Sequence, residues 1–220
     1  HFTFCQARQY RDFDFWLGRW AVTTRQGAPS GRSEVTSDVD GCAVMEFFAG
    51  GQGQSFSAYD RSTGQWNQDY VDHQGLTLRL QGRVADGAMR MEDSVRAIPN
   101  GPSLKSRFAW SADTAANGVR QTWWFSTDGG ATEQVNFDGL YRRDPAYEVG
   151  QSPPDVVCRE RPAYRALDAL LGTWRVSFMG DEVGTATLVA TTGGCLIEET
   201  FTDTRTTHPG GAYRLKALLY

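Results

Sequence analysis

The fold follows from the stretch Phe13-Asp14-Phe15-Trp16-Leu17-Gly18-Arg19-Trp20, whose end returns later in the chain as Leu171-Gly172-Thr173-Trp174. Further along, Gly41-Cys42 with Glu46 and Phe48 is echoed by Gly194-Cys195 with Glu199 and Phe201. Several unlike residue types at a nearly fixed offset do not recur easily by chance. We therefore interpret the chain as two copies of one structural unit.

The four cysteines follow the same repetition. Cys5 and Cys42 are separated by 37 residues, and so are Cys158 and Cys195. The equal spacing favours one disulfide in each pair over four free thiols or a zinc site, since C-x-x-C is absent and histidines are few. Each bridge would contribute on the order of 3 kcal/mol. Disulfides persist outside the cytosol, and the chain starts at His1 as a processed protein would, so we expect a periplasmic or secreted protein.

Composition excludes two classes of function. Hydrophobic residues make up 40% of the chain and charged residues 22%, which is enough for a packed core. The net charge is −4 and the basic residues form no long run, so we expect no nucleic-acid partner. No window approaches the roughly 18 apolar residues of a membrane span, so we expect no transmembrane segment. Aromatic residues reach 12%, which suits both cores and ligand cavities.

Alternating residues indicate strands. Leu76, Leu78 and Leu80 would share one strand face, and turn sequences such as Asp86-Gly87 and Asn117-Gly118 divide the chain into short segments. A helical turn or two is expected within residues 7–16. Strands are expected at residues 19–26, 31–39, 42–49, 54–59, 65–72, 76–81, 88–95, 103–111, 118–126 and 132–141. This pattern predicts an all-β fold, an antiparallel up-and-down barrel of about ten strands, whose closure removes exposed edges.

The predicted organisation is a barrel over residues 1–144, a linker over 145–157 that contains Pro153-Pro154, and a partial second copy over 158–220. The second copy offers strands at residues 173–178, 184–191, 195–202 and 213–220. Four strands do not close a barrel. Three interpretations stay open: the natural chain continues beyond Tyr220, the half-copy pairs with that of another subunit in a homodimer, or it packs as an open sheet on the first barrel.

The Gly-x-Trp of Gly18-Arg19-Trp20 resembles the opening motif of lipocalins and related calycins, and Gly172-Thr173-Trp174 matches it too. The resemblance implies that the Trp closes one end of a barrel and that an Arg near the last strand, here Arg142 or Arg143, packs over it. The longer pattern from Phe13 to Trp20, with Gly139-Leu140-Tyr141 before those arginines, looks like a group of exported bacterial domains of unassigned function. It implies a lipocalin-like fold and no particular activity.

Aromatic and polar residues on the same strand faces predict a cavity. Trp66, Gln68 and Tyr70 share one face, and Gln121 and Trp123 share another. Converging aromatics with a few polar groups are typical of a small-molecule site, although a small barrel can also be filled by them. The predicted ligand-binding residues are Glu46, Trp66, Gln68, Tyr70, Arg107, Gln121 and Trp123.

Two residues are weak candidates for acid–base catalysis. Glu46 lies in an apolar stretch and needs either a partner, for which Arg107 or Arg79 is available, or a raised pKa. His73 would share a strand face with Asp69 and form an Asp–His couple. No nucleophile motif accompanies either residue. We expect no metal site, and no cofactor either, because His73 is the only histidine inside the first copy apart from its first residue, and no motif marks it as a haem ligand.

The function that these patterns favour is binding of a small apolar or aromatic molecule in the first barrel of an exported protein. Two alternatives remain. One is an enzyme acting on a hydrophobic substrate inside the barrel, with Glu46 or His73 as acid or base. The other is a structural or assembly module whose barrels are filled by their own side chains. Fold alone does not decide between them.

Overall fold

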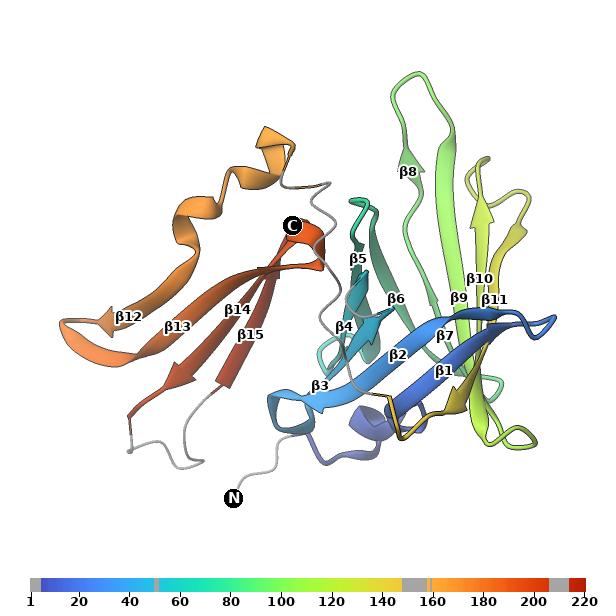
Figure 1. Cartoon of the computed structure of the whole chain (residues 1–220), viewed down its shortest axis with the longest axis horizontal. Coiled ribbons are helices and arrows are strands. Elements are labelled where there is room, and N and C mark those ends of the chain that lie inside the picture. Colours follow the sequence, from blue (N-terminus) through green and yellow to red (C-terminus); the bar gives the residue numbers. More distant parts are fainter. Residues whose placement is uncertain (1–4, 50–51, 148–157, 159, 206–213) are drawn as a thin grey trace.

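The computed structural model describes residues 5–49, 52–147, 158, 160–205 and 214–220. Its main feature is a closed antiparallel barrel of ten strands, in the order β10-β11-β1-β2-β3-β4-β5-β6-β7-β9, with β9 pairing back to β10 (Figure 1). The barrel strands are β1 (Gly18–Thr24), β2 (Pro29–Asp38), β3 (Ala43–Phe48), β4 (Gly53–Asp60), β5 (Gln65–Asp72), β6 (Thr77–Ala85), β7 (Ala88–Glu92), β9 (Ser103–Asp113), β10 (Gly118–Ser126) and β11 (Gln134–Arg143). The all-β barrel and its ten expected strands are confirmed.

The segment after β7 departs from the prediction. The expected strand over residues 88–95 ends at Glu92, and a further short strand, β8 (Arg96–Ala97), pairs with β9. The cause is Asp93, whose side chain accepts a hydrogen bond from the Ser106 backbone N–H at 2.6 Å and an Arg96 hydrogen bond at 3.0 Å. A side chain that takes a backbone donor in this way ends regular strand pairing.

Three short 3-10 helices accompany the first strands: η1 (Arg8–Arg11), η2 (Asp14–Trp16) and η3 (Val39–Gly41). They include the helical turns expected within residues 7–16. Trp20, at the start of β1, is buried, and its Nε1 donates to the backbone oxygen of Trp16 at 2.9 Å. The Arg143 guanidinium lies 4.0 Å from the Trp20 ring centre and donates to the backbone oxygen of Leu17 at 2.6 Å. The expectation that an arginine after Tyr141 covers this tryptophan is thus confirmed for Arg143.

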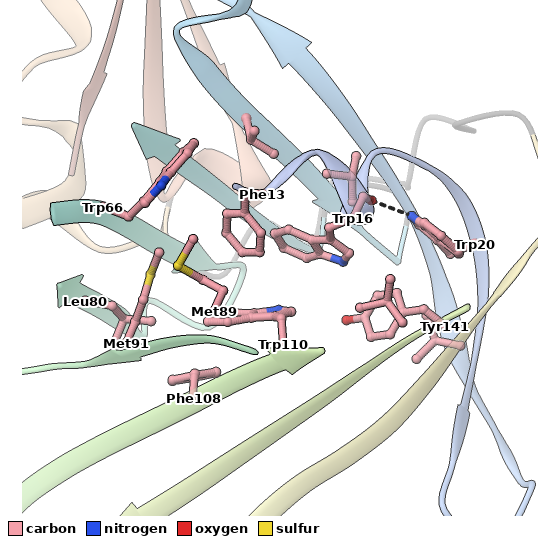
Figure 2. Close-up of a cluster of buried hydrophobic side chains, with 14 of the residues drawn as sticks. Phe13, Trp16, Trp20, Trp66, Leu80, Met89, Met91, Phe108, Trp110 and Tyr141 are labelled. Carbon is pink, nitrogen blue, oxygen red and sulfur yellow. Dashed lines mark hydrogen bonds between the residues drawn. The ribbon is translucent and has the colours of Figure 1, made fainter. Parts of the chain in front are cut away.

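Aromatic side chains fill the barrel beside η2, as Figure 2 shows. Phe13 stacks on Trp16 with ring centres 4.9 Å apart, and meets Trp66 and Trp110 edge-on at 5.6 Å and 5.4 Å. All four side chains are at most 1% exposed. The residues that the sequence places just before the Gly-x-Trp motif therefore form the plug of the barrel rather than a surface helix.

A second, open sheet follows in the chain and lies beside the barrel (Figure 1). Its elements are η4 (Pro162–Arg165), η5 (Asp168–Leu170), β12 (Gly172–Phe178), β13 (Asp181–Thr191), η6 (Thr192–Gly194), β14 (Leu196–Asp203) and β15 (Arg214–Leu219). Its strands match the four expected segments, except that Tyr213 lies outside the described residues. Gln54 of β4 joins the two sheets, donating to Glu198 at 3.0 Å and accepting from Thr191 and Thr192 at 3.2 Å.

Both predicted disulfides are present. Cys5 is bonded to Cys42 and Cys158 to Cys195, with Cα atoms 5.0 Å apart in each pair. Most of the predicted linker, residues 148–157, lies outside the described part of the chain. Within that part, no helix is long and apolar enough to cross a membrane.

Candidate functional site

The barrel interior contains a cavity of about 180 Å³. The polar side chains on its wall are Glu46, Gln68, Tyr70, Gln121, Asn136 and Tyr141. The apolar part of the wall consists of the rings of Phe48, Phe108, Trp110, Trp123 and Phe137. Trp110 belongs to the aromatic plug as well, so the cavity begins where the plug ends.

Strand alternation explains why these residues face the same space. Glu46 and Phe48 are two positions apart on β3, and Gln121 and Trp123 are two positions apart on β10, so each pair shares one face of its strand. Trp123 pairs with Phe108 of β9 on one side and with Phe137 of β11 on the other. Gln68 and Gln121 each lie two positions from a core residue, Trp66 and Val119, so with Glu46 and Tyr141 they form a buried polar band near the plug. Asn136 is exposed, and the rings other than that of Trp110 form a layer that lies farther from the plug.

Glu46 is the most unusual residue of the polar band. Its side chain accepts a hydrogen bond from the Ser33 hydroxyl at 2.8 Å, and the residue is 5% exposed. Burial raises the pKa of Glu46 from 4.5 to about 7, although the hydrogen bond from the Ser33 hydroxyl opposes this rise. Within the described residues no cationic side chain lies at ion-pair distance from this carboxyl group.

The prediction that Arg107 or Arg79 pairs with Glu46 was wrong, because both arginines point out of the barrel. Arg107 binds Glu133 through two hydrogen bonds and lies 4.0 Å from the centre of the Trp124 ring. Arg79 forms an ion pair with Asp69 at 3.3 Å. For a long charged side chain on a barrel of this size, extending into solvent costs less free energy than entering the apolar interior.

Three other polar side chains of the wall, those of Tyr141, Gln121 and Gln68, are hydrogen-bonded. The Tyr141 hydroxyl donates to Oε1 of Gln121, and Nε2 of Gln68 donates to the Ser57 hydroxyl at 2.8 Å. Burial, followed by the nearby charge of Asp72, raises the pKa of Tyr70. Burial raises the pKa of Tyr141 as well. Both phenols therefore stay neutral at physiological pH.

The ring layer is stacked. Phe108 lies between Trp110 and Trp123, with ring centres 5.3 Å and 5.1 Å away. Gly139 makes room for the Phe137 ring, because a Cβ atom at this position would collide with it. The buried indole N–H groups of Trp110 and Trp123 have no hydrogen-bond acceptor among the described residues. Both nitrogen atoms are inaccessible to solvent, so these two donors are unsatisfied groups of the interior.

Five of the predicted ligand-binding residues line the cavity: Glu46, Gln68, Tyr70, Gln121 and Trp123. Two do not. Trp66 shares the inward face of β5 but lies at plug level, where its Nε1 donates to the backbone oxygen of Gln9 at 3.2 Å. Arg107 is on the outward face, as its alternation with Phe108 would have indicated.

His73 is outside the cavity wall. It follows the last residue of β5, and its Nδ1 lies 3.1 Å from the backbone oxygen of Gln52. The structure does not bear out the expected Asp–His couple, because Asp69 instead contacts Arg79 and accepts a hydrogen bond from the Tyr220 hydroxyl at 2.6 Å. The strand ends before His73, so the alternation that relates the two positions does not extend to it.

Several lining residues were not predicted, chiefly Phe48, Phe108, Phe137 and Tyr141. The first is two positions from Glu46 and the second is two from Trp110, so period-2 alternation was enough to find them. Phe137 and Tyr141 lie two positions on either side of Gly139 within the strand expected at residues 132–141, so the same alternation places them on one face.

The described residues contain no group of three or more His, Cys, Asp or Glu side chains placed to hold a metal ion. No protein-family model matches the chain. A search of curated proteins finds no significant match either. The geometry of the cavity is therefore the basis of any functional assignment.

Proposed function

We propose that this protein binds a small, mostly apolar or aromatic molecule in the cavity of its barrel. The observation that carries the proposal is the cavity itself: about 180 Å³, with stacked rings on its wall and a band of polar groups beside the plug. Sites for small molecules combine these two features. For scale, an apolar cavity of about 150 Å³ accommodates benzene.

Native mass spectrometry of gently purified protein tests this proposal, together with titration of 4-propylphenol followed by tryptophan fluorescence. The wild type is expected to carry a small molecule or to bind the phenol. Gln121→Phe fills the cavity and is expected to abolish binding. Thr122→Phe adds the same ring to the opposite face of β10 and serves as the control. A wild type that binds nothing, or a Gln121→Phe variant that binds normally, would count against the proposal.

The barrel supports a lipocalin-like unit over residues 1–144, with a partial second copy over 158–220. The second sheet has the same local features: Trp174 donates to the Leu170 backbone oxygen at 2.7 Å, as Trp20 does to Trp16. The pairing irregularity after Val22 recurs after Val176. A longer natural chain or a shared barrel in a homodimer would cover β12, where Trp174 is 48% exposed. Sedimentation of the purified chain tests the homodimer.

Export to the periplasm or the exterior completes the proposal, supported by the two disulfides. Non-reducing peptide mapping of protein from its natural host tests it, and free thiols at these positions would contradict it.

Acid–base catalysis at Glu46 is the second candidate function. The observation in its favour is the carboxyl group on the cavity wall with a pKa of about 7, which suits proton transfer near neutral pH. If it is catalytic, Glu46→Gln abolishes turnover of a substrate while leaving its binding largely intact.

A further inference from the structure

The carboxyl group of Glu46 has partners suited to an anion but no counter-ion. The Ser33 hydroxyl donates to it at 2.8 Å, and the hydroxyls of Tyr141 and Ser55 lie beside it. Hydroxyl donors stabilise the carboxylate form, whereas removal from water destabilises it. A buried carboxylate is normally paired with a positive charge. Here the described residues supply none, and the open side of the carboxyl group is the cavity.

The rest of the wall suits a cation. Phe48 is two positions from Glu46 on the same face of β3, and Tyr70 lies close enough to feel its charge. Trp123 and Phe137 complete the aromatic wall. Aromatic faces attract organic ammonium groups, most strongly where water is excluded. A carboxylate among rings is therefore a site for a positively charged group attached to an apolar body.

We propose that the ligand is a small organic amine, bound with its ammonium group against Glu46 and its aromatic or apolar body within the ring layer. The cavity limits the body to about one ring with a short chain. This inference rests on the proposed function and specifies the ligand class for the same cavity.

Isothermal titration with tyramine and with 4-propylphenol tests the proposal, because the two probes differ mainly in an ammonium or a methyl group. Tyramine is expected to bind the wild type at least about tenfold more tightly than 4-propylphenol at pH 8. Glu46→Gln is expected to weaken the binding of tyramine by about thirtyfold or more and to leave the affinity for 4-propylphenol nearly unchanged. Glu92→Gln removes an exposed carboxylate of β7 and should change neither affinity.

The pH dependence provides a second measurement. The groups that face Glu46 are Ser33 of β2, Ser55 of β4, Tyr70 of β5 and Tyr141 of β11, and the pKa values of both phenols are raised. Among these groups, Glu46 alone therefore changes charge between pH 5 and pH 8. Since its pKa is about 7 and amines stay protonated over this range, tyramine affinity should rise by about twentyfold or more from pH 5 to pH 8, up to a ceiling of about a hundredfold.

The possible outcomes separate the two proposals. If 4-propylphenol binds as tightly as tyramine at every pH, the amine is wrong and the small-molecule site stands. An affinity for 4-propylphenol that falls with rising pH would show that neutral Glu46 donates to an oxygen of the ligand, and would also overturn the amine. If neither probe binds and no small molecule co-purifies, both proposals fail.

Discussion

Replacement of Glu46 by glutamine should make the folded protein more stable at alkaline pH. The carboxyl group is held in the barrel interior with a pKa of about 7, against an ordinary value of 4.5. Glutamine has nearly the same shape, and its amide oxygen can still accept from the Ser33 hydroxyl. The variant therefore reproduces the neutral form of Glu46 at every pH.

The expected size follows from linkage. Below pH 4.5 the carboxyl group is neutral in both the folded and the unfolded chain, so it contributes no pH dependence. Between pH 4.5 and 7 the unfolded chain loses the proton while the folded chain keeps it, and stability falls as the pH rises. Each tenfold difference between the two ionisation constants corresponds to about 1.4 kcal/mol, so the loss approaches about 3 kcal/mol above pH 7.

Urea unfolding of both proteins at pH 4, 5, 6, 7 and 8 measures this difference. The free energy of unfolding of Glu46→Gln should match that of the wild type at pH 4 and exceed it by about 3 kcal/mol at pH 8. Other titrating groups contribute equally to both proteins and cancel. Glu92→Gln, at an exposed position, should show no such trend. A difference between Glu46→Gln and the wild type that stays constant with pH would refute the assignment of a raised pKa to Glu46.

Three further outcomes are expected. Arg143→Ala should lower the free energy of unfolding by about 1–2 kcal/mol, because the guanidinium covers Trp20. Arg142→Ala should leave the free energy of unfolding nearly unchanged, and urea unfolding measures both variants. Removing the Cys5–Cys42 bridge by double substitution to serine should cost about 3 kcal/mol in the same assay. Gly139→Ala should push the Phe137 ring toward the cavity and weaken 4-propylphenol by about tenfold, measured by fluorescence titration.

The barrel strands could be predicted because each one depends on residues that are close together in the sequence. Gln65–Asp72 and Gly118–Ser126 have the bounds that turn residues and alternation predict. Closure followed from the need to cover edges, and the disulfides followed from equal spacing. The short β8 escaped prediction because it depends on the side chain of Asp93 meeting Ser106 on another strand, and no local pattern encodes that contact.

The sequence predicts which site residues point into the barrel, but not how far along the barrel axis each of them lies. Alternation shows which face of a strand points inward, so Gln68 and Tyr70 were placed correctly. It does not show how far along the barrel axis a residue lies, and Trp66 on the same face therefore fell in the plug. Depth depends on the stagger of neighbouring strands and on how far the chain before β1 reaches into the barrel. Both are properties of the whole fold.

A comparison between the two sheets bears on why Glu46 is present at all. Glu46 pairs with Val35 and Phe48 with Ser33 on the neighbouring strand, while in the second sheet Glu199 pairs with Leu188 and Phe201 with Ala186. If the sheets are copies, as proposed, the glutamate is common to both, but the hydroxyl that donates to it belongs to the barrel alone. A barrel that required only stability would gain from an apolar residue at position 46, because the buried carboxyl group lowers stability near neutral pH. A binding or catalytic role would explain why a destabilising carboxyl group lies on a cavity wall with a hydroxyl donor beside it. A structural barrel filled by its own side chains would not explain it.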